Sequence, residues 1–183
     1  MAKLTDRSFG QYPRAMRSRI VSQAVALFAR RGIDGVSIAE VAVASGVSKA
    51  NVMHHFGTKD GLYAACLDVI DAHLHTVVDD ATSAGGTVSD LRGALEIWAE
   101  VHPEDPRLMA YGLLRLPERD GRWALSDPVL RMIDLVSPEV GDVESAAAVV
   151  VDLLGNVTYR EMARPIVEAH RGQIEQRTGT ADR

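Results

Sequence analysis

The spacing of apolar side chains predicts that helices make up nearly all of this chain of 183 residues. Near the N-terminus, apolar residues recur at intervals of three and four positions, which places them on one face of a helix. The members of this stripe are Met16, Ile20, Ala24, Leu27 and Phe28. The stripe predicts a core helix that ends at Gly32, because glycine accepts the left-handed conformation that closes a helix.

Two short helices are predicted next, over residues 38–44 and 49–55. Two short helices that cross steeply need small or apolar residues where they meet, and a turn residue that tolerates positive φ. Gly46 can supply the turn. The contact positions are Ile38, Val41, Ala42, Val47 and Val52.

Hydroxyl side chains mark the start of each helix in this region. Ser37 and Glu40 form a capping box before the first short helix, and Ser48 can cap the second. Thr58 is expected to cap a third helix, so that Lys59 lies in its first turn, where free backbone N–H groups can also meet a phosphate. These signals together predict a helix-turn-helix, an arrangement with which proteins read DNA.

The second helix of this motif is expected to carry the side chains that read DNA. With Val52 taken as the inward direction and about 100° per residue, His55 and Phe56 fall on the buried side. The outward positions offer an amide for adenine, an imidazole for a base edge or a phosphate, and apolar groups for a thymine methyl. The predicted DNA-binding residues are Ser37, Ser48, Lys49, Ala50, Asn51, Met53, His54, Lys59 and Arg17.

Charge is distributed unevenly along the chain. The whole chain has a net charge of −5, which taken alone argues against binding to nucleic acid. Residues 1–60, however, carry nine Lys and Arg against four Asp and Glu, a net charge of +5, and the remainder carries −10. The basic part is therefore the part with the helix-turn-helix, and an acidic remainder would be repelled by DNA and help to orient the molecule.

Residues 17–63 resemble the N-terminal domain of TetR-type transcriptional regulators. The resemblance rests on the first helix, on Ser37-Ile38-Ala39-Glu40-Val41-Ala42, and on residues 46–59 with their Phe-Gly-Thr-Lys exit. It implies three partners, namely a double-stranded DNA operator, a small-molecule effector and a second copy of the chain. Met53 departs from the pattern, because the family usually has a tyrosine there whose hydroxyl bonds a DNA phosphate.

Helical patterns continue beyond the motif, with a long connecting helix over residues 61–82. Further helices are predicted over residues 88–101, 105–116, 122–136, 142–158 and 160–177. The predicted fold class is all-α, with two domains that share a linking helix. Residues 1–60 form a three-helix DNA-binding domain with the helix-turn-helix, and residues 61–183 form a helical effector-binding and dimerisation domain.

Aromatic residues are few in this chain, and four of them lie among the predicted helices of the second domain, where methionines accompany them. They favour an apolar effector pocket between helices, or else they fill gaps in a mostly aliphatic core. The candidate pocket residues are Trp98, Met109, Tyr111, Trp123 and Tyr159. No apolar run approaches the length of a membrane span, and no secretion signal is found, so we expect a cytoplasmic protein with Cys66 as a packed core thiol.

Residues 145–154 are unusually apolar and small for a helix on the surface of a monomer. They are either buried core or part of a homodimer interface in which the last two helices pack against their symmetry mates. We expect the dimer, because a single recognition helix binds DNA weakly while two half-sites add their free energies. The predicted interface residues are Ala147, Val150, Val151 and Leu154.

Other classes of function fit the sequence less well. An all-helical metalloenzyme would need paired Glu-x-x-His motifs, which are absent, so Asp71 and His75 are better explained as a surface ion pair. We therefore predict no catalytic residue, no metal site and no cofactor. A helix-turn-helix protein that only contacts proteins, or that binds DNA without an effector, is the remaining alternative. The favoured function is a DNA-binding repressor that a small molecule releases from a near-palindromic operator.

Overall fold

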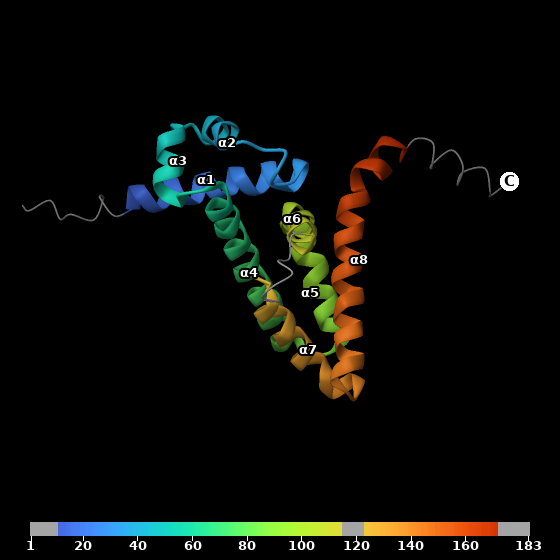
Figure 1. Ribbon diagram of the computed structural model, residues 1–183. Helices are drawn as coiled ribbons and strands as arrows, with labels where there is room; N and C mark the ends of the chain where they lie inside the picture. Colours follow the sequence, from blue (N-terminus) through green and yellow to red (C-terminus); the bar gives the residue numbers. More distant parts are fainter. Residues whose placement is uncertain (1–10, 115–122, 172–183) are drawn as a thin grey trace, which may run out of the picture.

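The computed structural model describes residues 11–114 and 123–171, and within these stretches all regular structure is helical. The predicted all-α fold class is confirmed. The helices are α1 (Gln11–Arg31), α2 (Ile38–Ser45), α3 (Lys49–Phe56), α4 (Lys59–Ala84), α5 (Val88–Val101), α6 (Glu104–Leu113), α7 (Ser126–Val140) and α8 (Val143–Ala169) (Figure 1).

Helices α1 to α3 form one group, which we call the head. Helix α1 lies across one side of it, with α2 and α3 on the other (Figure 1). Ile20, Ala24 and Phe28 of the predicted apolar stripe are completely buried. Met16 and Leu27 are partly buried at the edge of the same core. The stripe therefore forms the buried face that its spacing predicts, and α1 packs against α2, α4 and α6.

The corner between α1 and α2 is fixed by backbone and charged groups. Gly32 has φ 68°, and its amide donates to the carbonyl of Phe28 at 2.8 Å, which closes α1 as predicted. Ser37 and Glu40 form the predicted capping box, and Arg31 donates to Glu40 Oε1 at 2.8 Å. Hydrogen bonds from the backbone and side chain of Ser37, and then that from Arg31, lower the pKa of Glu40 from 4.5 to about 2.

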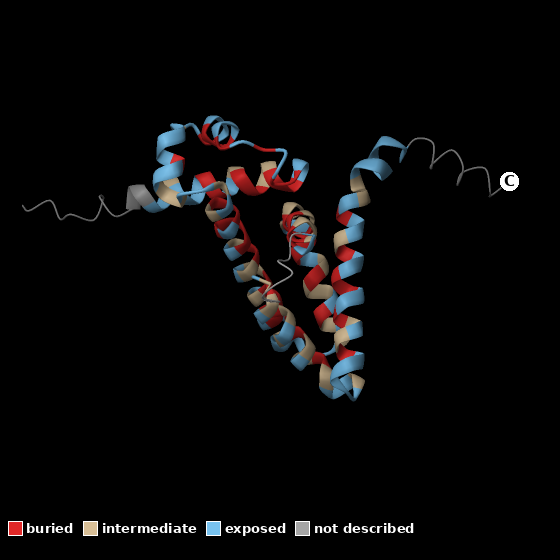
Figure 2. Ribbon diagram, in the orientation of Figure 1, coloured by how far each residue is buried: buried red, intermediate tan, exposed pale blue. Residues whose placement is uncertain are grey.

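Helices α4 to α8 form a second group, the body, and α4 belongs to both because it starts in the head and runs down into the body (Figure 1). Its inward face is buried along most of its length (Figure 2). Cys66 lies on this face, fully buried, and desolvation raises the pKa of its thiol to about 12. The prediction that Cys66 is a packed core thiol is confirmed.

The end of the chain differs from the prediction, because α8 is one helix through residues that were assigned to two. Pro165 lies inside it and has no N–H with which to reach the carbonyl of Glu161. Arg107 of α6 donates its Nε to that carbonyl at 2.9 Å instead, so the freed acceptor is satisfied by another helix. Helix α7 likewise continues past Pro138 and ends at Gly141, which has φ 106°. The predicted boundary near residues 115–122 lies outside the described residues.

Replacing Glu40 by Gln is expected to lower the midpoint temperature of thermal unfolding at neutral pH. The midpoint of the variant is also expected to depend less on pH than that of the parent chain. The folded-state pKa of about 2 lies below the ordinary 4.5. The carboxylate therefore stabilises the fold fully above its ordinary pKa, and this contribution disappears as the pH falls toward the folded-state value.

Circular dichroism melts of both proteins from about pH 7 to pH 3 would test this. The difference between the two midpoints should shrink as the pH falls. The control is Glu100→Gln, at an exposed position on α5. A difference for Glu40→Gln that stays constant across this range would contradict the role of the charged capping box.

Candidate nucleic-acid interface and body cavity

The turn between α2 and α3 is built as a tight helix-turn-helix corner. Gly46 adopts the left-handed conformation with φ 63°, and the amide of Val47 donates to the carbonyl of Ala42 at 3.0 Å. Val41 and Val52 are completely buried where the two helices meet. Ser48 caps α3 by accepting from the backbone N–H of Asn51 at 3.1 Å. The predicted turn and caps are confirmed.

Helix α3 separates into a buried and an exposed side, as helical geometry predicts. Val52 is buried, and His55 and Phe56 are half-buried against the head. The exposed residues form what we call the reading face: Lys49, Ala50, Asn51, Met53 and His54. These side chains lie on one surface of a rigid helix and are free to meet a groove of DNA.

The other predicted DNA-binding residues lie around this face in different settings. The guanidinium of Arg17 stands 5.2 Å from the centre of the Phe56 ring, so α1 holds a cation beside the end of α3. Lys59 is half-buried in the first turn of α4, which Thr58 caps through the amide of Gly61 at 2.9 Å. Ser37 donates its hydroxyl to Glu40 at 2.8 Å, so its proton is used within the capping box and not offered to DNA.

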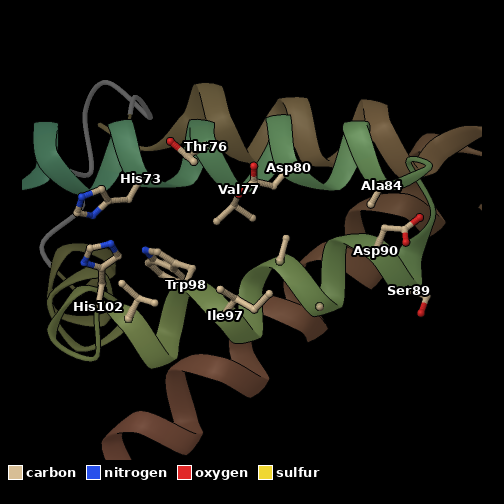
Figure 3. Close-up of a pocket in the computed structure, with 13 residues that line it drawn as sticks. His73, Thr76, Val77, Asp80, Ala84, Ser89, Asp90, Ile97, Trp98 and His102 are labelled. Atoms are coloured by element: carbon tan, nitrogen blue, oxygen red, sulfur yellow. The ribbon is translucent and has the colours of Figure 1, made fainter.

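An open-sided cavity of about 520 Å³ lies in the body between α4 and α5. Figure 3 shows Val77 and Thr76 of α4 on one wall, and Ile97 and Trp98 of α5 on the other. Gly93 also faces this space, and nothing lies within 4 Å of where its β-carbon would be. The cavity is mostly apolar along its length and carries polar groups at both ends, as sites for small organic molecules do.

The predicted pocket residues are not brought together, because only Trp98 lines this cavity. Met109 is buried in the core, and the Tyr111 ring packs on the corner at Gly32. Trp123 lies beside Gly112, and Tyr159 is 76% exposed on α8. The sequence did not indicate the other residues that line the cavity. The cavity lies where small residues such as Gly93 and Ala94 leave space, and not where large side chains gather.

The predicted dimer residues are also divided between two sides of α8. Val150 and Leu154 point into the core of their own chain and are buried there, which corrects their assignment to an interface. Ala147 is half-buried, and Val151 is 65% exposed. The exposed side of α8 instead carries a stripe of small and apolar residues, which we call the α8 stripe: Ala148, Val151, Gly155, Tyr159, Met162 and Ile166.

The pair Asp71 and His75 forms the surface ion pair that the sequence predicts, with 3.6 Å between carboxylate and imidazole. Arg131 of α7 contacts the same imidazole, with 2.7 Å between its Nη1 and His75 Nδ1. A guanidinium at this distance would repel a metal cation. These contacts join α4 to α7 and have no evident catalytic use.

A helix-turn-helix with an exposed second helix, joined to a larger helical body, is an architecture of DNA-binding proteins. Residues 20–66 match the model of the family described as bacterial regulatory proteins, tetR family. Residues 20–66 therefore carry the DNA-binding domain that is typical of this family.

Relatives of known role agree with this assignment. The chain is 36% identical over 107 residues to the HTH-type transcriptional regulatory protein RaaS of Mycobacterium tuberculosis, which covers 58% of this chain and 47% of that protein. It is 33% identical over 122 residues to the HTH-type transcriptional repressor AcnR of Corynebacterium glutamicum. This alignment covers 67% of this chain and 57% of AcnR. The chain thus spans about half the length of these curated relatives.

The fold extends the similarity into the body. The structure superposes on the putative transcriptional regulator SCO4942 from Streptomyces coelicolor with a TM-score of 0.65, 24% identity and coverage of 86% of each chain. The names of all three proteins describe transcriptional regulation. Among the described residues, no helix combines the length and apolar character needed to cross a membrane.

Proposed function

We propose that this protein is a homodimeric transcriptional repressor that binds a near-palindromic operator and is released from it by a small molecule. The observation that carries the proposal is the reading face, a set of exposed side chains on a helix whose opposite side is buried through Val52. The match of residues 20–66 to the TetR family supports DNA binding, and the name of AcnR supports repression.

The chemistry of the reading face suits the major groove, which is wide enough to admit an α-helix. Asn51 offers an amide that can pair with adenine through two hydrogen bonds, and His54 offers an imidazole for a base edge or a phosphate. Lys49 and Lys59 supply positive charge for the phosphate backbone at either end of α3. The net charge of +5 over residues 1–60 supports the same orientation on DNA.

The α8 stripe supports pairing of two copies of the chain. Contiguous apolar side chains on a monomer surface mark contact sites. Ala148 and Gly155 have small side chains, which allow a second helix to approach closely, and nothing in the same chain lies within 4 Å of a β-carbon built on Gly155. Symmetric pairing through this surface would place two copies of α3 on one duplex, roughly 34 Å apart for successive major grooves.

Helix α4 offers the route by which a ligand could release DNA. Lys59 lies at its first turn beside the head, and Thr76 and Val77 of the same helix line the cavity. A ligand that fits the cavity better at one position of α4 would shift the separation of the two recognition helices. The cavity also favours this proposal over a DNA-binding protein without an effector, which would have no need of it.

The reading face makes a prediction that separates base contacts from phosphate contacts. Asn51→Ala and His54→Ala should each relax base preference at one position of the operator, because each removes a base contact worth about 1 to 3 kcal/mol. Lys59→Ala should instead weaken binding to all sequences alike and reduce the salt dependence by about one phosphate.

Selection from a random duplex pool, followed by fluorescence anisotropy at several salt concentrations, would measure both effects. His170→Ala, at an exposed histidine on the far end of α8, is the matched control and should behave as the parent chain. If both reading-face variants kept the parent's base preference, the reading face would be misplaced.

The α8 stripe makes a prediction about assembly. Val151→Glu should convert the dimer to a monomer, because it places a charge within the stripe. It should preserve the fold, because Val151 is 65% exposed. Val143→Glu is the matched control, since Val143 is also 65% exposed but lies outside the stripe, in the first turn of α8.

Analytical ultracentrifugation gives the mass in each case, and circular dichroism confirms that the helices are intact. A Val151→Glu protein that sediments as a dimer would remove the α8 stripe as the interface. Equal loss of the dimer in both variants would mean that the charge acts generally and not through the stripe.

The cavity makes a prediction about ligand binding. Gly93→Leu should fill part of the space between α4 and α5, because nothing lies within 4 Å of its β-carbon position. The helix should tolerate the change, since replacing a helical glycine by leucine gains roughly 0.5 to 1 kcal/mol. Binding of anilinonaphthalene sulfonate, a fluorescent apolar probe, should therefore weaken while operator affinity is kept.

Ala72→Leu is the control for this experiment, because Ala72 is exposed on α4 and does not line the cavity. Saturable probe binding, with energy transfer from Trp98, should be the same in this variant and the parent chain. Unchanged probe binding in Gly93→Leu would show that the cavity is not the site.

A further inference from the structure

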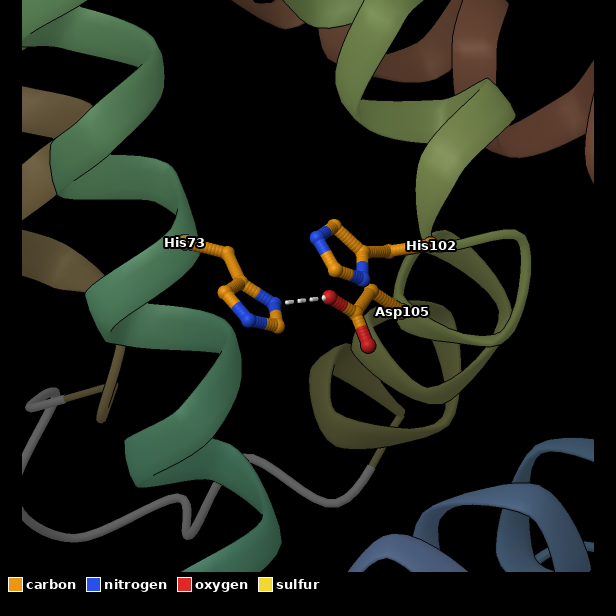
Figure 4. Close-up of side chains that lie close together, drawn as sticks. All are labelled: His73, His102 and Asp105. Carbon is orange, nitrogen blue, oxygen red and sulfur yellow. Dashed lines mark hydrogen bonds and ion pairs between the residues drawn. The ribbon is translucent and has the colours of Figure 1, made fainter.

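The body also holds a cluster of two histidines and one aspartate that the proposed function does not use. Three side chains lie close together (Figure 4): His73 of α4, His102 at the end of α5 and Asp105 in the first turn of α6. Their candidate ligand atoms all lie within 4.8 Å of one another. We propose that these three side chains bind a divalent transition-metal ion of the zinc class.

The set of donor atoms fits this class of ion. Two imidazole nitrogens with one carboxylate oxygen are ligands that zinc accepts, and three protein ligands leave a fourth position for water or another molecule. Bonds of about 2 Å require ligand atoms no more than about 4 Å apart. The stacked imidazoles must rotate apart before both nitrogen lone pairs can point at one ion, and both histidines are only half-buried, which leaves room for that rotation.

The carboxylate of Asp105 is held in place from two sides. His73 Nδ1 lies 2.6 Å from its Oδ2, and Trp98 donates its indole N–H to the same oxygen at 3.3 Å. The Asp105 side chain is 5% exposed, and within the described stretches His73 is the group that forms an ion pair with it. A buried negative charge with so little compensation is suited to accept a cation.

The two imidazoles lie face to face, with 3.9 Å between ring centres and 13° between ring planes. A metal ion is bound by the nitrogen lone pair of a neutral imidazole, so both rings would bind the ion in their neutral form. For His73 to bind through Nδ1, its proton moves to Nε2, and the metal takes the place of the present hydrogen bond to Asp105.

The cluster is also accessible. His73 and His102 line the cavity between α4 and α5, and they line a second cavity of about 430 Å³ that reaches Arg17 and Val21 of α1. An ion could therefore enter from either side. Once bound, it would tie α4 to the corner between α5 and α6, directly beside the head.

The test uses the full chain without a histidine tag, freed of metal by a chelator and then dialysed. Calorimetric titration with Zn²⁺ should show one ion bound per chain, and Co²⁺ should give the visible absorption of a tetrahedral site with nitrogen ligands. His73→Gln, His102→Gln and Asp105→Asn should each weaken binding by at least about tenfold.

His75→Gln is the matched control, because it removes a histidine two positions from His73 that faces Arg131 and not the cluster. It should bind the ion as the parent chain does. Zn²⁺ should also raise the unfolding midpoint of the parent and of His75→Gln, and of none of the cluster variants. If Asp105→Asn fails to fold, His102→Gln still tests the proposal, because His102 is only half-buried.

Absence of stoichiometric binding in the parent chain would overturn the proposal. It would also be overturned if His73→Gln and His102→Gln bound Zn²⁺ as tightly as the parent chain does. Equal loss in His75→Gln would place the ion elsewhere and overturn it too. The proposal does not depend on the proposed repression, since metal binding is measured without DNA and none of these variants touches the reading face.

Discussion

The structure depends on the continuous burial of one side of α4. Leu62 lies against the head, Ile70 and Leu74 lie in the middle, and Ala81 lies near the far end, all completely buried. A helix packed in this way along most of its 26 residues moves as a rigid rod, because bending it would open gaps in both cores. Whatever displaces α4 in the body must therefore also displace it where it meets α3.

This constraint explains why the two groups of helices cannot be divided cleanly at residue 60. Thr58 caps α4 inside the head, and Cys66, eight positions later, contacts the carbonyl of Val21 in α1 at 3.9 Å. The domain division into residues 1–60 and 61–183 stays a useful proposal about function. Physically, the first turns of α4 belong to the core of the head, and this shared packing is what could couple the cavity to DNA.

The head was predictable from sequence because its determinants are local. Gly46, Ser48 and Val52 lie within seven residues of one another, and each specifies its own conformation or burial. The length of α8 was not predictable in the same way, since Pro165 signals a helix break. The carbonyl that Pro165 leaves without its helical partner is bonded by Arg107, which lies 54 positions away in the sequence. The orientation of α8 was also ambiguous, because Val150 and Val151 are equally apolar neighbours and only packing decides that the first faces inward.

The body sites escaped the sequence for a related reason. His73 and Asp105 stand 32 positions apart and are joined by the antiparallel turn from α4 into α5, which no short spacing rule describes. Asp71 and His75, one helical turn apart, satisfy such a rule, and yet the imidazole of His75 contacts Arg131 in the folded chain. Spacing along one helix therefore selects pairs that are close in any helix. The surroundings of a histidine on α4 depend instead on which neighbouring helix packs beside it. Helix α7 places the guanidinium of Arg131 beside His75, whereas α6 places the carboxylate of Asp105 beside His73.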